Sequence, residues 1–576
     1  MTVHLTSDTA QVRKARGAFF TPHELCRYVA SWAIRSASDE VLEPSCGEAA
    51  FLLAAGERLD TLAALAGELP GGRNGIGLRG IELHPDSARQ AEALVRAAGH
   101  KARVIAGDFF LIPPVGRYDA VIGNPPYVRY QNFAGEARAR SREAALRAGV
   151  ALTRLASSWA AFTVHSALFL KPGGRLGLVL PAELLSVNYA AEVRRFLMQR
   201  FARVRLVLFT ERVFPGVQEE VVLLLADGYG RGPADHCELQ QLPTAADLAG
   251  AAPLIRTWKP DPVEGKWTSS LLSTAALEAH LALQRSGQFT TLQSWGETTL
   301  GMVTGNNKYF ALPADRAAEL GLCRDELLPV SPPGSRHLRG LAFTAAAHQQ
   351  LAQTGSSTLL FRPADQPSQA ARRYIRAGEQ LGVHTAYKCR VRSPWWRVPL
   401  VSPADVLVTY MNADSPRLCA NHARTHHLNS VHGLYLQPEL RKLGIDLLPL
   451  GTLTSMTLLG AETVGRAYGG GMLKLEPKEA DRLPVPEPGV LQQAQTVLTA
   501  IRPRVTALLG RPGGLAEAVK LLDDVLLVGE LGIAASEVKS LQDAHAELAT
   551  RRAARGGAGR GLPAADSSTQ PVGVPY

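Results

Sequence analysis

Up to about residue 230, the chain alternates short apolar segments with helical ones, and this rhythm limits the fold more than any other feature. The apolar segments include VLEPS, GLRGIEL, ARVIAGDF and YDAVIGNPPY, and a stretch such as DSARQAEALVRAAG lies between two of them. Strands that alternate with helices predict a right-handed parallel sheet in an α/β domain. TRLASSWAAFTVHSALFL then predicts an amphipathic helix that stops at LKPGG (170–174), and VRLVLF and EEVVLLLA predict two strands that close the sheet.

Beyond about Gly230 the alternation fades, and DGYGRGPAD is typical of a linker. We expect a Rossmann-like first domain over 1–235 and a mixed α+β second domain over 240–490. Helical periodicity returns over 491–553 and predicts C-terminal helices. The tail 554–576 is poor in apolar residues and rich in Gly, Ala, Pro and Arg, so we expect it to be disordered.

Composition indicates the cellular setting. The six cysteines form no C-x-x-C pair, so neither a disulfide framework nor a zinc site is predicted. The N-terminus lacks the apolar core of a signal peptide, and no apolar run reaches the roughly 18–20 residues that span a bilayer. We therefore expect a soluble cytoplasmic protein with no metal and no membrane partner. The net charge of +10 permits a polyanionic partner such as nucleic acid but does not require one.

Polar residues stand where the first three predicted strands end, which is where doubly wound sheets bind ligands. Glu43 and Gly47 follow the first strand, Glu82 ends the second, and Asp108 and Phe109 follow the third. Glu82 is placed to accept hydrogen bonds from ribose hydroxyls, and Asp108 beside Phe109 suits the amine and ring of adenine. Each alone is more often a helix cap, but in this order they predict an adenosine site. Since G-x-G-x-x-G and Walker motifs are absent, the pattern does not demand phosphate binding, and S-adenosylmethionine is a ligand of this kind.

Asn-Pro-Pro-Tyr (124–127) follows the apolar strand 119–123, and two successive prolines end a strand in a rigid turn. With LEPSCG, GIEL and GDFF before it, and ARGAFFTP (15–22) ahead of them all, this motif resembles the DNA amino-methyltransferases that make N6-methyladenine. The order of segments is similar to that of the gamma class, which includes Taq-type enzymes of type II restriction-modification systems. The resemblance is strong to about Leu225 and patchy beyond.

The resemblance implies roles for the four residues of this motif. The side-chain oxygen of Asn124 and the carbonyl of Pro125, held by the turn with Pro126, would accept the two hydrogens of an adenine amine. Methyl transfer is then direct, with no covalent enzyme intermediate, so Cys46 is not treated as a nucleophile. The target base must leave the duplex, and Tyr127 is the expected stacking partner.

Further residues are assigned by their match to the family. Phe214 matches a second base-contacting aromatic, and its alternative is a core phenylalanine. Thr21 and Pro22 match the segment around the methionine end of the cofactor, although a Thr-Pro pair by itself means a helix cap.

The segment 361–397 holds eight Lys or Arg against two acidic residues, with Tyr and Trp interleaved, a pattern typical of nucleic-acid contact. A solvated basic face over a core Trp pair is the alternative. Segments 299–310, 430–436 and 469–486 resemble parts of gamma-class recognition domains and are equally compatible with plain turns. The expected DNA contacts are Lys388, Arg390, Arg392, Trp395, Trp396 and Arg397.

These features together predict a site-specific DNA methyltransferase that modifies N6 of adenine in double-stranded DNA and protects it from a cognate restriction endonuclease. We expect a monomer in the cytoplasm, associated with the nucleoid through DNA. A methyltransferase acting on protein glutamine or RNA, and a catalytically silent DNA-binding protein, remain alternatives. A fused nuclease is disfavoured because little chain precedes ARGAFFTP. The recognition sequence is hidden, and a palindrome containing TCGA follows from similarity to Taq-type enzymes alone.

Overall fold

A computed structural model describes residues 21–67, 77–128, 135–211, 213–214, 220–250, 254–260, 262–263 and 265–554. The chain divides into two compact units, residues 1–271 and 272–576. The expected boundary near residue 235 differs from this division, because the strands β8 (Cys237–Leu242) and β9 (Ile255–Trp258) continue the sheet of the first unit. Residues 555–576 of the expected disordered tail lie outside the described part, so that expectation stays a prediction.

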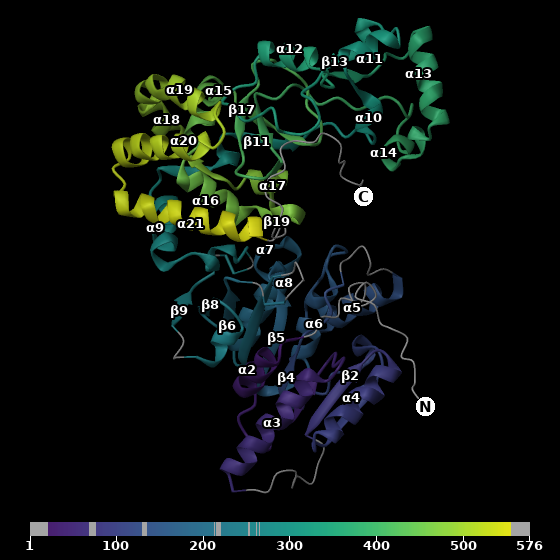
Figure 1. The fold of residues 1–576 in the computed structure, drawn as a ribbon, viewed down its shortest axis with the longest axis vertical. Helices are drawn as coiled ribbons and strands as arrows, with labels where there is room; N and C mark the ends of the chain where they lie inside the picture. The colour runs from purple at the N-terminus through teal and green to yellow at the C-terminus, as the bar shows by residue number, and fades with distance from the viewer. Residues whose placement is uncertain are drawn as a thin grey trace. The chain divides into compact units, whose positions relative to one another are not determined.

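Unit 1 is an α/β domain built on a nine-stranded sheet with the order β3-β2-β1-β4-β5-β7-β6-β8-β9 (Figure 1). Its other strands are β1 (Val41–Glu43), β2 (Leu78–Glu82), β3 (Ala102–Ala106), β4 (Tyr118–Gly123), β5 (Leu170–Pro181), β6 (Phe201–Phe209) and β7 (Val221–Tyr229). Its helices are α2 (His23–Ala33), α3 (Ala50–Leu65), α4 (Pro85–Ala97), α5 (Gly135–Arg147), α6 (Ser158–Ala167), α7 (Glu183–Ser186) and α8 (Ala191–Arg200), with 3-10 turns at Phe109–Leu111, Asn188–Ala190, Ala246–Ala249 and Thr268–Leu271.

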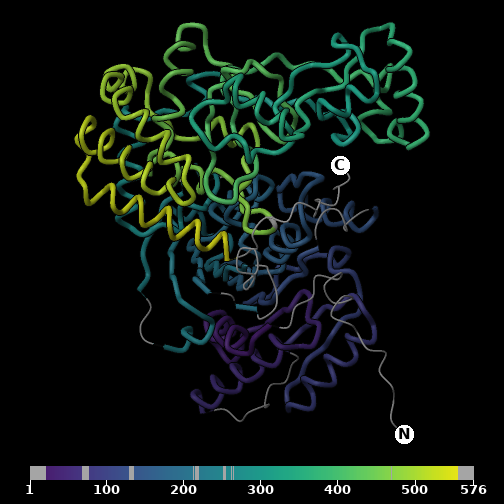
Figure 2. The backbone as a smooth tube through the Cα atoms, turned by 45° about the horizontal axis from the view of Figure 1, so that its top comes forward, coloured from purple at the N-terminus to yellow at the C-terminus, as the bar shows by residue number. Residues whose placement is uncertain are grey.

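Strands β1 to β5 run parallel, so their carboxyl ends share one edge of the sheet. β7 pairs antiparallel with both β5 and β6 and closes the parallel region. Ala120 and Ile122 of β4 share a core with helices α2, α3 and α4, whereas Val121, equally buried, points to the other face by the two-residue period of a strand. Helices α6 and α8 contact β5 and β6. The purple and blue part of the tube in Figure 2 follows this alternation of strand and helix.

The segment Lys171 to Gly174, which the sequence predicted as a helix stop and turn, lies inside β5. Helix α6 ends earlier than expected, at Ala167, and the pairing of β5 with β4 shifts register between Tyr118 and Ala120. Gly173 has a φ of 83°, a conformation that a residue with a Cβ rarely adopts. The Pro-Gly-Gly sequence is therefore absorbed as an irregularity at the start of a strand.

Unit 2 contains four small sheets, β11-β18-β15-β17, β12-β14-β13, β16-β20-β19 and β10-β21. The strands are β10 (Phe289–Thr291), β11 (Gly296–Leu300), β12 (Ala311–Leu312), β13 (Leu327–Pro329), β14 (Leu359–Phe361), β15 (Val406–Thr409), β16 (Met411–Asn412), β17 (Leu418–Ala420), β18 (Val431–Leu436), β19 (Arg466–Tyr468), β20 (Met472–Lys474) and β21 (Pro484–Pro486). The helices are α9 (Thr274–Arg285), α10 (Asn307–Phe310), α11 (Ala314–Glu319), α12 (Ala345–Gln353), α13 (Gln369–Gln380), α14 (Tyr387–Arg390), α15 (Arg441–Gly451), α16 (Ser455–Val464), α17 (Pro477–Ala480), α18 (Pro488–Gln493), α19 (Gln495–Leu509), α20 (Gly514–Leu522), the π-helix Asp523–Glu530 and α21 (Ala535–Ala554), with 3-10 turns at Leu292–Ser294, Arg324–Glu326, Val383–Thr385 and Gly469–Gly471.

Two large apolar cores, and a smaller cluster around Phe343 and Leu407, support the described part of this unit. One lies among α15, α16 and α18 to α20 together with the strands β15 and β18. The other, from Met302 to Leu428, supports β12 to β14 and the helices α10, α13 and α14. Figure 1 shows α10, α11, α13 and α14 at one end of this unit and α15 and α18 to α20 at the other. We call the part that contains α10 to α14 the basic lobe, because it carries the segment 361–397.

Among the described residues, no single helix has the length and apolar composition to cross a membrane. Helices α15 and α16 meet that test of length and composition as a pair, with a bend of 89° between them. Leu448, Leu450 and Leu459 from this pair are fully buried inside unit 2.

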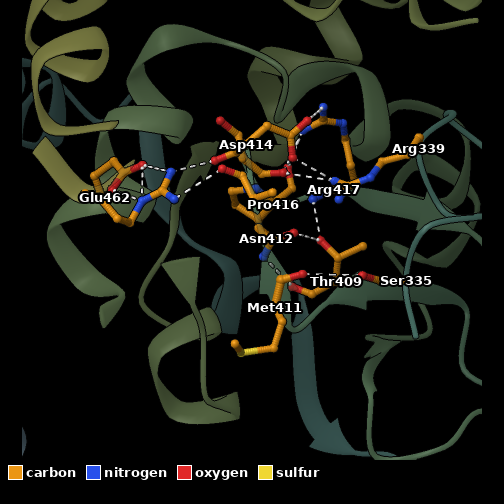
Figure 3. A network of polar contacts seen from close by, with 12 residues as sticks. Ser335, Arg339, Thr409, Met411, Asn412, Asp414, Pro416, Arg417 and Glu462 are labelled. Carbon is orange, nitrogen blue, oxygen red and sulfur yellow. Dashed lines mark hydrogen bonds and ion pairs between the residues drawn. The ribbon is translucent and has the colours of Figure 1, made fainter. Parts of the chain in front are cut away.

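A buried ion pair fastens the last described helix, α21, to the body of unit 2. The guanidinium of Arg552, 3% exposed, donates to both carboxylate oxygens of Glu462 and to the carbonyl of Asp414 at 2.8 Å. The carboxylate of Asp414 accepts in turn from Arg339 and Arg417, each at 2.9 Å. Figure 3 shows Asp414 beside Arg339 and Arg417, with Glu462 on the other side of the network.

Arg552→Met should destabilise unit 2 strongly, because it leaves the carboxylate of Glu462 buried without its partner. The expected loss is about 3–5 kcal/mol in the free energy of unfolding, measured by chemical denaturation. Lys539→Met on the same helix is the control, since its ion pair with Asp543 is exposed and should contribute little. Equal stability of the two variants would contradict the assigned role of Arg552.

Candidate active site

The loop after β4 places an amide and two carbonyls at the carboxyl edge of the sheet. The Asn124 side-chain nitrogen donates to the hydroxyl of Thr21 at 3.1 Å, and its oxygen accepts from the hydroxyl of Tyr127 at 2.7 Å. Thr21 is 6% exposed and immediately precedes Pro22, the residue before α2. The Asn124 amide is thus held at both ends, with its nitrogen at Thr21 and its oxygen at Tyr127.

Tyr127 bridges the loop to the neighbouring strand. Its hydroxyl lies 2.7 Å from the side-chain oxygen of Asn124 and 3.0 Å from the carbonyl of Val179 in β5. The hydroxyl has one proton, so it satisfies these two acceptors one at a time. Its ring is partly buried against the core of the α2–α3 face. The Asn124 oxygen has two lone pairs, so it can accept from an amine while it accepts from the Tyr127 hydroxyl.

Two serines hold the carbonyls on either side of Pro125. Ser45 donates to the carbonyl of Asn124 at 3.3 Å, and Ser158 donates to the carbonyl of Pro126. Within the described part of the chain, the carbonyl of Pro125 has no hydrogen-bond partner. Sequence reasoning missed both serines, and the one available signal was the Ser-Ser pair at the start of the helix with Ser158.

The second strand ends in a fixed carboxylate. Glu82 accepts from the backbone N–H of Gly47 at 3.0 Å and from that of His84 at 3.1 Å, which links the ends of β1 and β2. A Cβ built on Gly47 would meet no atom within 4 Å, so the space above this turn is open. The turn is also strained, because the adjacent Ala49 has a left-handed φ of 64°. A polar ligand can reach Glu82 here.

At the end of β3, Phe109 differs from the expectation, whereas Asp108 does not. Asp108 accepts from the N–H of Phe110 at 3.0 Å, and its second oxygen lies 3.4 Å from the guanidinium of Arg140. Phe109, however, is 3% exposed, and its ring stacks at 5.2 Å on both Phe162 and Phe169. Packing against α6 therefore uses the aromatic surface that we expected to face a heterocycle. Phe109 thus packs in the core behind Asp108.

Glu43 and Cys46 are buried residues at the end of β1 and in the turn that follows it. The carboxylate of Glu43 is buried and accepts from the N–H of Leu52 in the first turn of α3 at 3.0 Å. Burial raises its pKa well above the usual range, and the neighbouring charge of Glu82 adds to this rise. Burial likewise raises the pKa of the Cys46 thiol, which keeps the thiol protonated. Glu43 thus holds the start of α3 rather than presenting a free carboxylate.

Phe214 belongs to the same core as the ring of Tyr127 and is 3% exposed. Of the two interpretations made from the sequence, burial favours the core phenylalanine. The neighbouring residues 215–219 lie outside the described part.

Four of the six side chains predicted to contact DNA are structural in the basic lobe. Trp396 is 9% exposed, and the indole of Trp395 donates to Glu379 at 3.1 Å. Arg392 donates to the carbonyl of Thr304 at 2.8 Å and to that of Val303. Arg397 pairs with Asp365 and lies over the ring of Trp396. The interleaved basic and aromatic residues mostly build this lobe, because long side chains of both kinds pack as well as bind.

Three exposed positive charges lie close together along helix α13. Arg372, Arg373 and Arg376 of α13 are exposed, while Ala371 and Ile375 on the opposite side of the helix are buried. We call these three residues the arginine face. Of the predicted DNA contacts, Arg390 is exposed and Lys388 is partly so.

Two family models match the chain, one in each unit. Residues 4–228 match the family described as N-6 DNA Methylase. Residues 264–527 match the C-terminal domain of the Type II methyltransferase M.Eco57I.

Relatives and solved structures extend these matches over most of the chain. The Type II methyltransferase M.AccI of Acinetobacter calcoaceticus is 22% identical over 89% of this chain and 93% of its own length. M.XamI of Xanthomonas campestris pv. amaranthicola is 26% identical over 82% and 85% respectively. The Type IIL restriction-modification enzyme MmeI, solved in complex with DNA, has a TM-score of 0.54 at 13% identity over 92% of this chain and 75% of MmeI. A DrdV–DNA complex has a TM-score of 0.50 at 11% identity over 86% and 57%. At these identities the structures show a shared fold.

Glu43→Gln should stabilise the protein at neutral pH and leave its stability unchanged in acid. Because the folded state raises the pKa of Glu43, the unfolded chain loses this proton first as the pH rises above about 4.5, and stability then falls with pH. Glutamine keeps an acceptor for the N–H of Leu52 without the buried charge. Thermal unfolding of both proteins across this pH range measures the difference. A difference that does not grow with pH would show that Glu43 is not buried as described.

Proposed function

We propose that this chain, whose residues 4–228 belong to the N-6 DNA methylase family, transfers a methyl group from S-adenosylmethionine to N6 of adenine in double-stranded DNA. It is a DNA methyltransferase of a restriction-modification system, and the M.Eco57I-type C-terminal match and full-length type II relatives support this assignment. The observation that carries the finer proposal is the loop after β4. There the Asn124 oxygen and the Pro125 carbonyl are two acceptors in fixed positions.

Two acceptors suit an exocyclic amine. The lone pair of such an amine is delocalised into its ring, and the nitrogen becomes nucleophilic when both hydrogens are held so that it turns pyramidal. Asn124 and Pro125 supply these acceptors without reorganisation, since Thr21 fixes the amide and the serines hold the flanking carbonyls. Positive charge on the attacking nitrogen is stabilised by the same two dipoles. Cys46, protonated and buried, takes no part.

The residues at the carboxyl edge fit S-adenosylmethionine. Glu82 would accept the ribose hydroxyls, because its carboxylate is fixed by two backbone donors and the space at Gly47 is open. Asp108 would accept the adenine amine of the cofactor. Thr21 and Pro22 lie beside Asn124, where the methionine end would approach the acceptors. The cofactor supplies the methyl group on its sulfonium.

A base within a duplex must rotate out of the stack to reach this loop. Tyr127 would stack on it, and the incoming amine would donate to the Asn124 oxygen beside the Tyr127 hydroxyl. One chain can methylate a palindrome one strand at a time, so the proposed reaction requires no oligomer, and we propose that the protein acts as a monomer. We also infer that it works in the cytoplasm beside an endonuclease of the same specificity.

The direct test is the identity of the product. The purified protein is incubated with unmethylated genomic DNA and S-adenosylmethionine, and the DNA is digested to nucleosides for mass spectrometry. N6-methyladenine is the expected product. Methylated cytosine would overturn the adenine assignment, and labelled protein or RNA without labelled DNA would favour the alternative methyltransferases. Binding to DNA with no methylated product would favour the catalytically silent protein.

Asn124→Ala should reduce turnover by about 100- to 1000-fold, because one of two preorganised dipoles at the reacting nitrogen is lost. Cofactor affinity, measured by calorimetry, should stay close to the wild-type value, since Asn124 is not among the residues assigned to hold the cofactor. Tyr127→Phe is the contrasting variant, as it keeps the stacking ring and the Asn124 oxygen and removes only the hydroxyl that donates to that oxygen. It should remain active. Equal loss of cofactor binding and turnover in Asn124→Ala would contradict the assigned role.

The arginine face should contribute to the salt dependence of DNA binding. Changing Arg372, Arg373 and Arg376 together to Ala should make the slope of log K against log salt shallower by about 2 to 3, near one per lost phosphate contact. Arg316→Ala in the same lobe is the control, because Arg316 is paired with Glu319 at 2.8 Å. An unchanged slope in the triple variant would remove α13 from the DNA interface.

A further inference from the structure

Ser158, the first residue of α6, makes three hydrogen bonds to the end of the catalytic loop. Its hydroxyl donates to the carbonyl of Pro126 and accepts from the N–H of Val128 at 2.9 Å. Its own N–H donates to the carbonyl of Val128 at 3.1 Å. The side chain is 1% exposed, so no water competes for these bonds.

The hydrogen bonds of Ser158 also restrict the orientation of the Pro125 carbonyl, one residue earlier in the loop. The rings of Pro125 and Pro126 fix both φ angles. Ser158 holds the peptide plane that follows Pro126, and Ser45 holds the plane that precedes Pro125 through the carbonyl of Asn124. Two torsions between these anchored planes remain, the ψ angles of Pro125 and Pro126, and with both planes held they set the direction of the Pro125 carbonyl.

The hydrogen-bond pattern also selects which carbonyl is available. The carbonyls of Asn124 and Pro126 each accept from a serine, while that of Pro125 has no partner in the described part of the chain. A buried carbonyl without a partner is costly unless a ligand satisfies it. Of these three carbonyls, that of Pro125 is therefore the one left to accept a hydrogen bond from the substrate.

We propose that Ser158 is a positioning residue, which holds the Pro126–Val128 turn so that the Pro125 carbonyl faces the amine of the target base. Neither Ser158 nor Ser45 is placed to contact the reacting nitrogen. Ser158 acts through the loop and touches neither the base nor the cofactor. This inference rests on the proposed methylation of an exocyclic amine.

The test compares Ser158→Ala with Ser166→Ala in single-turnover methyl transfer to unmethylated genomic DNA. Ser166 lies on the same helix, is equally buried, and its hydroxyl has no partner in the described structure, so it is a matched control. Ser158→Ala should slow the methyl-transfer rate by about 10- to 100-fold, the effect of a small misplacement of a reacting group. The dissociation constants for S-adenosylmethionine and DNA should match those of Ser166→Ala, a split that a general loss of structure would not produce.

A second variant covers the case in which Ser158→Ala fails to fold. Ser158→Cys keeps a similar shape with a weaker donor and acceptor, and it should slow methyl transfer with cofactor affinity intact. A transfer rate in the folded Ser158 variants equal to that of Ser166→Ala would overturn the positioning role. A wild-type protein that methylates no DNA would instead overturn the proposed function, so the two failures are distinguishable.

Discussion

Two adjacent prolines at the end of β4 impose the constraint on which the candidate site depends. They remove two backbone donors and fix two φ angles, so the loop cannot continue the strand and presents its carbonyls at the edge of the sheet. Three neighbouring elements then fasten it, with Ser45 after β1, Thr21 before α2 and Ser158 at the start of α6. The surrounding parallel sheet places these three segments at one edge.

The carboxylates around this loop have separate tasks that follow from their burial. Glu43 is enclosed and holds the start of α3, with its pKa raised by the loss of water. Glu82 lies one strand away, fixed by two backbone donors and open at Gly47. Asp108 caps a short turn and keeps one oxygen toward Arg140. The buried group supports the fold, and the two accessible groups are those that suit a cofactor.

The sequence predicted the parallel α/β unit and the Asn-Pro-Pro-Tyr loop well, because strand periodicity and proline chemistry are local properties. It did not predict that β8 and β9 extend the sheet past residue 235, since strand pairing depends on partners distant in the chain. Phe109, Trp395 and Arg392 were expected to contact ligands, yet each packs inside its unit. Side chains of these types serve cores and ligands alike, and composition does not distinguish the two. Ser158 was missed because serine is common at the start of a helix, and the sequence does not show that its hydroxyl bonds the Asn-Pro-Pro-Tyr loop.

The central claim is that this loop methylates an exocyclic adenine amine at a specific DNA sequence. Single-molecule sequencing of plasmid DNA from cells that express the intact chain, read for modified bases at every position, tests it most directly. The account predicts N6-methyladenine confined to one short motif and absent from DNA of cells that lack the protein. DNA with no modified base, from cells in which the protein is folded and binds S-adenosylmethionine, would contradict it.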